Sequence, residues 1–199
     1  MKFRLVLRGD VPSHRRGTVD AKHRIRRELH PQLRNHWRQH GMLKQAWKPR
    51  ERDGIQPVAA LADSHARFGF RFVPLVQQGM ACSLHILLLR REDPFRLFTG
   101  SGDIDGRVKT LLDGLRMPQQ LPELGGATPG EDEDPFFCLL EDDQHVFDLS
   151  VETDRLLIPP EPEASDNPHA AVAIISVHVR MALGAEFAVI GDVGFFNPY

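Results

Sequence analysis

Alternating polar and apolar residues predict β-strands along the whole chain. In residues 2–8 every second side chain is apolar, which is the pattern of a half-buried strand. A hairpin is expected at 67–90, where alternating phenylalanines and a second apolar run flank a turn at Gly79. Its second strand, 82–89, is apolar on both sides, as in a central strand whose two faces are covered. Further strands are expected at 146–152, 171–181 and 186–196.

Apolar residues at four-residue spacing predict a first helix in the basic segment 20–45. The residues of this stripe are Ile25, Leu29, Leu33 and Trp37. Asp20 is expected to cap the helix, which would begin near Ala21. Pro31 lacks a backbone N–H and is expected to break or kink the helix near His30.

A second helix is predicted at the end of the stretch 102–115. Asp105, Lys109 and Asp113 follow one another at four-residue steps, so they drift by only about 40° per step and share one stripe. Four apolar side chains form a separate stripe that would be buried: Val108, Leu111, Leu112 and Leu115. The helix therefore combines a buried face with an edge of carboxylates and a lysine, which suits a divalent cation next to a phosphate.

The order of the elements predicts the fold class. A strand, a helix, two strands, a second helix and two or more strands indicate an α+β domain with a mixed or antiparallel sheet. The 199 residues fit one domain, 1–199, with a long loop insertion at 116–135. Apolar residues make up 41% of the chain and charged residues 26%, which is enough apolar material for a core.

Charge is distributed unevenly along the chain. Residues 1–50 hold 14 of the 25 lysines and arginines, and residues 101–165 hold 16 of the 27 acids. This pattern favours a polyanion-binding surface next to an acidic one, although two solvated surfaces of opposite sign would look the same. The acidic run 131–134 is expected to be a mobile, solvated loop tip.

The cysteines, the histidines and the lack of long apolar runs indicate the cellular compartment and the metal chemistry to be expected. Two cysteines without a CxxC motif, no signal peptide and no apolar run of 18 residues favour a reduced, cytoplasmic protein without a membrane span. Histidines are frequent in the basic segment, but no acidic or cysteine partners accompany them, so a zinc site is not expected there. These histidines are His23, His30, His36 and His40.

Aspartates at two points suggest a metal site. Asp103 and Asp105 stand at the start of the second helix, and Asp142 and Asp143 stand at the start of a later strand. Magnesium prefers hard oxygen ligands, often one or two carboxylates completed by water and a substrate phosphate. The alternative is structural, because aspartates also cap helices and form turns, and Asp105 with Lys109 could be an ordinary helical ion pair.

The same residues resemble the RusA family of Holliday junction resolvases. The resemblance consists of Asp103-Ile-Asp105, Lys109, Asp113-Gly-Leu115 and, later, Asp142-Asp143-Gln144-x-Val146. It covers roughly residues 101–115 and 141–153. The family pieces that match are an Asp-x-Asp helix start, a lysine four residues later, an Asp-Gly-Leu ending and an Asp-Asp-x-x-Val strand start.

The resemblance implies a function and a site. Asp103, Asp105 and Asp143 would bind Mg²⁺, with Mn²⁺ as a possible substitute, and would converge around one or two cations. Lys109 would be the catalytic lysine, with Asp113 and Asp142 in support. The family hydrolyses phosphodiester bonds in branched DNA as a homodimer. Arginines and lysines expected to contact DNA phosphates are Arg15, Arg16, Lys22, Arg24, Arg26, Arg27, Arg34, Arg38 and Arg107.

Three departures from the family pattern leave an alternative open. Gly106 stands where the family usually has asparagine, and the connection from Leu115 to Asp142 is longer. The chain also has a basic N-terminal helix and a C-terminal extension beyond the compact family domain. The alternative is a catalytically inactive subunit with the same fold, which would bind nucleic acid or take part in a larger assembly. In that case the acidic run 131–134 would contact a basic protein partner.

Overall fold

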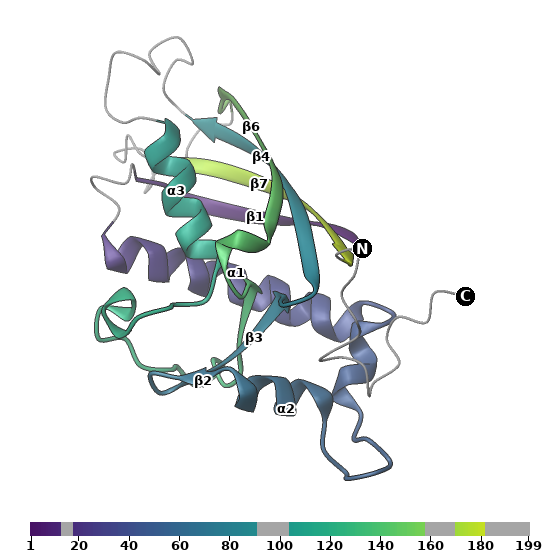
Figure 1. Ribbon diagram of the computed structural model, residues 1–199. Helices are drawn as coiled ribbons and strands as arrows, with labels where there is room; N and C mark the ends of the chain where they lie inside the picture. The colour runs from purple at the N-terminus through teal and green to yellow at the C-terminus, as the bar shows by residue number, and fades with distance from the viewer. Residues whose placement is uncertain (13–17, 91–103, 158–169, 182–199) are drawn as a thin grey trace.

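The computed structural model describes residues 1–12, 18–90, 104–157 and 170–181, and these form an α+β fold (Figure 1). The strands are β1 (Lys2–Asp10), β2 (Ala66–Arg67), β3 (Phe70–Val76), β4 (Met80–Arg90), β5 (Phe136–Leu140), β6 (Val146–Arg155) and β7 (Ala170–Met181). The α-helices are α1 (Val19–Gln39), α2 (Pro57–Ser64) and α3 (Ile104–Leu115). Short 3₁₀ helices are η1 (Leu43–Trp47), η3 (Leu121–Leu124) and η4 (Asp143–His145). The predicted α+β class is confirmed.

Four strands form the larger sheet, in the order β1-β7-β4-β6. Strand β7 runs antiparallel to both of its neighbours, whereas β4 and β6 are parallel. A parallel pair needs a crossover connection, and α3 lies within the one that joins β4 to β6. The three-stranded sheet β2-β3-β5 is also mixed, because β3 pairs antiparallel with β2 and parallel with β5.

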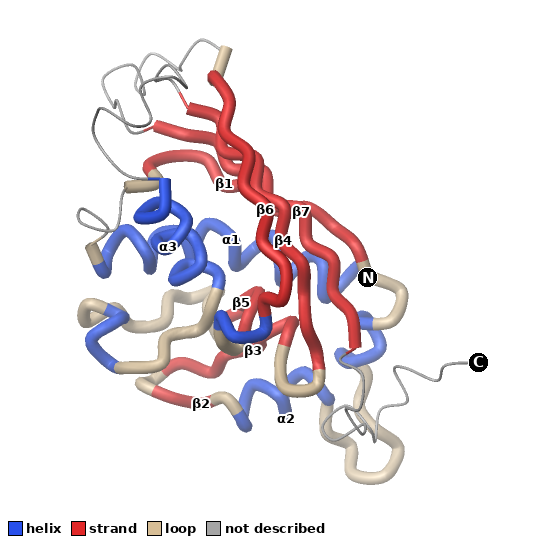
Figure 2. The backbone as a smooth tube through the Cα atoms, turned by 45° about the horizontal axis from the view of Figure 1, so that its top comes forward, coloured by secondary structure: helices blue, strands red, loops and turns tan. Residues whose placement is uncertain are grey.

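Helices α1 and α3 lie on one side of the larger sheet (Figure 2). Alternate side chains of its strands point toward them and are buried, among them Leu5, Ile86 and Ile175. On the other side, His85 of β4 is exposed and Leu87 is only partly buried. The prediction that both faces of 82–89 are covered is therefore wrong for the described residues. The apolar run indicated burial, but one face of β4 is covered and the other is open.

The hairpin predicted at 67–90 does not form. Strands β3 and β4 are consecutive along the chain but belong to different sheets. Strand β3 is buried over most of its length and pairs with β5, which follows it by sixty residues. The chain turns between the two sheets at Gly79, whose φ of 82° suits glycine. Alternation predicted the two strands, but it carries no information about which strands become neighbours.

Helix α1 begins earlier than predicted and continues past its proline. Its N-cap is Thr18, whose side chain accepts a hydrogen bond from the N–H of Ala21, while Asp20 lies in the first turn. Pro31 lies inside the helix on its exposed side, and α1 continues to Gln39, so the break predicted near His30 does not occur. A proline in a helix costs roughly 3 kcal/mol. Burial of the apolar stripe on both sides of Pro31 offsets this cost: Ile25, Leu29, Leu33 and Trp37 are each at most 4% exposed.

The acidic run 131–134 is docked against the rest of the protein. Glu133 pairs with Arg27 at 2.8 Å, Asp132 pairs with Arg34 at 3.2 Å, and Asp134 lies 3.2 Å from Arg71. The backbone carbonyl of Asp132 also bonds the ring of His30. Glu131, Asp132 and Asp134 are nevertheless exposed, as expected of a solvated tip, and only Glu133 is partly buried. The sequence did not indicate the ion pairs, because the arginines that form them are distant in sequence.

Both cysteines lie inside the protein. Cys82 and Cys138 are free and buried, and burial raises the pKa of the first to about 11 and of the second to about 12. None of the helices in the described part of the chain has the length and apolar character required to cross a bilayer. The strand predicted at 186–196 lies outside the described residues.

Candidate functional site

A hollow of about 630 Å³ lies between α3 and strand β6. The side chains that line it include Asp105, Lys109 and Asp113 from the predicted stripe of α3. Asp143 lines the same hollow from η4, and Leu149 and Val151 contribute its apolar wall from β6. The structure thus brings the two parts of the predicted motif, which are distant in sequence, to one surface.

Helix α3 presents this stripe because its other side is fixed in the core. Leu111 and Leu115 are at most 1% exposed. Gly114 sits so close to α1 that an added Cβ would lie 2.5 Å from Cγ2 of Ile25. A side chain at this position would push the helices apart, so the glycine permits their close crossing. The Asp-Gly-Leu ending therefore has a packing role here, in addition to any role in the site.

Asp142 and Asp143 have different surroundings. The Asp142 carboxylate caps η4 by accepting a hydrogen bond of 3.1 Å from the N–H of Gln144. Asp143 is exposed, and the structure shows no ion pair or hydrogen bond for its side chain within the described residues. The first aspartate shapes the turn, and the second is left open to the hollow.

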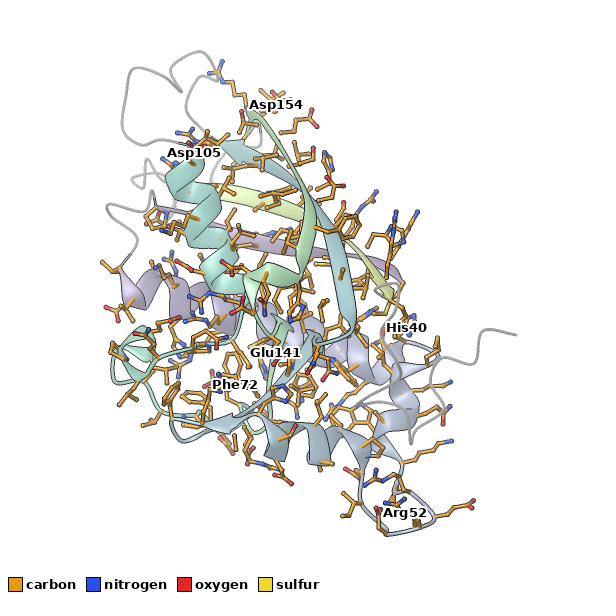
Figure 3. All side chains as sticks on the ribbon, viewed as in Figure 1. His40, Arg52, Phe72, Asp105, Glu141 and Asp154 are labelled. Carbon is orange, nitrogen blue, oxygen red and sulfur yellow. The ribbon has the colours of Figure 1, made fainter. Side chains whose placement is uncertain are left out.

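The hollow extends along α3. Asp105 lies at the start of the helix (Figure 3). At the other end of α3, the backbone of Arg116 forms an isolated parallel β-bridge with Leu140. Asp143 follows Leu140 by three residues in the sequence. Asp105 and Asp113 are eight residues apart, or about 12 Å along a helix. Within the described ranges, no three His, Cys, Asp or Glu side chains come close enough to hold a metal ion. Asp103, the third predicted ligand, lies outside those ranges.

Asp113 is already paired. Its carboxylate lies 2.7 Å from Lys22 Nζ and 3.2 Å from Arg116, and the residue is 8% exposed. Burial tends to raise the pKa of Asp113, but the hydrogen bonds and charges of Lys22 and Arg116 outweigh burial and hold the pKa below its usual value. Asp113 therefore stays ionised and ties α3 to α1. This agrees with a supporting position rather than a free ligand.

Two of the arginines expected on the DNA-binding surface are buried instead. Arg26 is 2% exposed and donates to the carbonyls of Arg116, Asp113 and Glu123. Arg107 is 1% exposed and donates to the carbonyl of Val11. Neither guanidinium can reach a nucleic acid in this structure. The sequence could not show that these arginines are buried, because nothing in the local pattern distinguishes a buried arginine from an exposed one.

The other predicted phosphate contacts differ in their availability. Arg27 and Arg34 are engaged by the acidic run, and Lys22 by Asp113. Arg24 and Arg38 are exposed on α1. Arg24 donates to the carbonyl of Asp10 at 2.6 Å, and Arg38 lies over the Trp47 ring. Arg15 and Arg16 lie outside the described residues.

Sequence reasoning missed a cluster that supports η4. The two carboxylate oxygens of Glu141 lie 3.7 Å from Nε2 of His65 and from Nε2 of His145, respectively. Glu141 also accepts a hydrogen bond of 3.1 Å from the N–H of Gln78. The cluster joins the end of β5 to α2, to the β3–β4 turn and to η4. Glu141 precedes Asp142 in the sequence, but no local pattern indicates that His65 and Gln78 contact its side chain.

Comparison with models of known protein families, with characterised proteins and with solved structures finds no match for this chain. The geometry of the hollow and the family resemblance of its residues are therefore the basis for a functional proposal.

Proposed function

We propose that the hollow beside α3 is the active site of a magnesium-dependent endodeoxyribonuclease that acts on branched DNA, as RusA-family enzymes do. One observation carries the proposal. Asp105, Lys109 and Asp143 belong to two separate motifs of that family, and all three line a single hollow. A DNA substrate agrees with the cytoplasmic setting expected from the sequence.

The donor groups of the hollow fit magnesium in type. Asp105 and Asp143 offer carboxylate oxygens on exposed residues, and one or two carboxylates with water and phosphate are a common Mg²⁺ environment. Asp103 precedes α3 by one residue and would add a third carboxylate. When bound, the ion would lower the pKa of an attacking water and neutralise charge on the phosphate oxygens.

Lys109 has the position expected of a group that stabilises the transition state. Its side chain is exposed in the hollow between Asp105 and Asp113, and the structure shows no ion pair for it within the described ranges. Its ammonium group can donate to the non-bridging oxygens of a phosphodiester as negative charge builds on them. The carboxylate of Asp113 is paired with Lys22 and Arg116, so Asp113 does not tie up the ammonium group of Lys109.

The test is a cleavage assay with the full chain on labelled four-way, forked and single-stranded DNA, in Mg²⁺ or Mn²⁺. Metal-dependent nicking of the branched substrates is expected. Asp143→Asn and Asp105→Asn should each lower the cleavage rate by about 1000-fold or more while DNA binding persists. Glu131→Gln is the matched control, since it neutralises an exposed acid away from the hollow. Cleavage that persists in both aspartate variants would refute the proposal.

A second candidate is favoured by one observation. Within the described ranges, which do not include Asp103, no three His, Cys, Asp or Glu side chains form a metal-binding group. A site with only Asp105 and Asp143 as ligands would suit a catalytically inactive, nucleic-acid-binding subunit of the same fold. Contact with a basic partner through 131–134 has less support, because three of those acids are paired within the chain. Binding of branched DNA without cleavage in either metal would favour this candidate.

A further inference from the structure

Asp143 has no side-chain partner within the described residues, so the direction of its carboxylate is set by the short turn that carries it. In η4 the N–H of Val146 bonds the carbonyl of Asp143, and the N–H of His145 lies 3.3 Å from the carbonyl of Asp142. A 3₁₀ helix of three residues has too few hydrogen bonds to be stable alone. Contacts from outside the turn are therefore needed to fix it.

The side chain of Glu141 spans this turn. Glu141 stands two residues before Asp143, and His145 stands two residues after it. One carboxylate oxygen of Glu141 lies 3.7 Å from Nε2 of His145, so this contact closes the turn with Asp143 at its midpoint. The His145 side chain is only 12% exposed, which leaves the ring little room to turn away.

Four further contacts hold Glu141, which is labelled in Figure 3, in its own place. Its carboxylate accepts a hydrogen bond of 3.1 Å from the N–H of Gln78 and lies 3.7 Å from Nε2 of His65. Its backbone N–H donates to the carbonyl of Val76 at 2.9 Å, and its carbonyl accepts from the Gln119 side chain at 2.7 Å. Both carboxylate oxygens and both polar groups of its backbone are thus engaged.

The same region is joined to the other half of the candidate site. In the segment that follows α3, the N–H of Met117 donates to the carbonyl of Leu140 at 2.9 Å. The end of β5 is thereby fixed to the chain that leaves α3. Glu141 stands at the junction of β5, this chain and η4, so it relates the position of Asp143 to the helix on the other side of the hollow.

We propose that Glu141 is a positioning residue, which sets the affinity of the hollow for a divalent cation by fixing the direction of Asp143. The described side chains that line the hollow do not include Glu141, so it acts on the ion through Asp143. Groups that orient a metal ligand in this way typically contribute about 10- to 100-fold to metal affinity. The role rests on the proposed function only in that a cation must occupy the hollow, and it does not require cleavage.

Titration of the full chain with Mn²⁺, followed by the electron paramagnetic resonance signal of the free ion, provides the test. Glu141→Ala should weaken Mn²⁺ binding by about 10-fold or more. Glu141→Gln should stay within about 3-fold of the wild type, because the amide oxygen can still accept a hydrogen bond from Gln78. An equal loss in both variants would mean that the charge of Glu141 attracts the ion through space, and would overturn the positioning role.

His145→Ala separates positioning from charge by the direction of its effect. Loss of an imidazole cannot remove negative charge, so charge alone predicts unchanged or tighter binding of Mn²⁺. Positioning predicts binding weaker by about 5-fold or more, because the turn that carries Asp143 is no longer closed. Glu152→Ala is the matched control, since Glu152 also lies 3.7 Å from a histidine, His85, but is not part of this turn. Its Mn²⁺ affinity should stay within about 2-fold of the wild type.

A double-mutant cycle shows whether Glu141 acts through Asp143. Added to Asp143→Asn, Glu141→Ala should lower the remaining Mn²⁺ affinity by no more than about 2-fold, because the ligand that it positions is already changed. A full effect on that background would overturn the proposal, as would wild-type binding that Glu141→Ala leaves unchanged, and both results would leave the proposed function standing. A wild type that binds no Mn²⁺ would refute the cation site and the proposed function together.

Discussion

Charged side chains have different roles on α1 and in the hollow beside α3. On α1, Arg26, Arg27 and Arg34 are paired with acids or carbonyls of the segment 113–133, and Arg26 is fully enclosed. In the hollow, Lys109 and Asp143 are exposed and show no ion pair in the described part of the chain. The first group fixes a long connection to a helix. The second group forms no such ties between elements, so its charges remain open to solvent.

Removal of Arg26 should have the largest effect on stability. Arg26→Ala leaves three carbonyls, one buried and two partly buried, without their donor and opens a cavity between α1 and η3. We expect a loss of about 3–5 kcal/mol in the free energy of unfolding, measured by urea titration. Arg24→Ala, on the exposed side of the same helix, should cost about 1 kcal/mol or less. Equal effects of the two changes would show that α1 does not depend on this buried arginine.

Gly114→Ala should destabilise the protein by about 1–3 kcal/mol, because the new methyl group would lie 2.5 Å from Cγ2 of Ile25. A double-mutant cycle with Ile25→Ala checks the cause. The double variant should lose less stability than the sum of the two single changes, by at least about 0.5 kcal/mol. Additive effects would mean that the α1–α3 contact does not explain the glycine.

Lowering the pH should reduce the free energy of unfolding through protonation of His23 in α1. Burial, followed by the charges of Arg27 and Arg26, lowers the pKa of His23 from 6.5 to about 4. The neutral ring is therefore favoured in the folded protein, and its stabilising contribution is complete above about pH 6.5 and is lost as the pH falls from 6.5 toward 4. His23→Phe should flatten the fall in unfolding free energy between pH 7 and 5. Some slope should remain from His36, whose pKa burial and His40 also lower to about 4. An unchanged slope would exclude His23 as the cause.

Changes in the hollow should have the smallest effect on stability. Lys109→Ala and Asp143→Asn should each alter the free energy of unfolding by no more than about 0.5 kcal/mol, because neither side chain is buried or paired. The same variants are expected to lose most of the cleavage activity proposed above. A loss of more than 1–2 kcal/mol in either would mean that these charges stabilise the fold, and the contrast with α1 would fail.

Local patterns in the sequence predicted most elements of the fold. The first strand, the α1 stripe, the helix ending at Leu115 and the strand 171–181 all appear close to their expected positions. Their signals are periodicities of two or 3.6 residues, which act within one element. The sequence could not reveal the separation of β3 from β4 into two sheets, since pairing with β5 depends on a segment sixty residues away.

The candidate site could be predicted only in part for the same reason. Asp105, Lys109 and Asp113 share a stripe by helical geometry alone, and the resemblance linked Asp143 to them. The pairing of Asp113 with Lys22, the enclosure of Arg26 and the contact of Glu141 with His65 each join residues far apart in the chain. A one-dimensional pattern shows that a charge is present, but its partner is decided by tertiary packing.

The position of β7 in the sheet has a consequence for the order of folding. Residues 170–181 lie between β1 and β4, so the strand that joins the two halves of the sheet is synthesised after both of them. Until it arrives, β1 has no partner in the larger sheet and β4 exposes an unpaired edge, a state prone to association between chains. Contacts across roughly 170 residues also imply slow folding. A nascent chain should therefore need protection by chaperones until residue 181 has emerged from the ribosome.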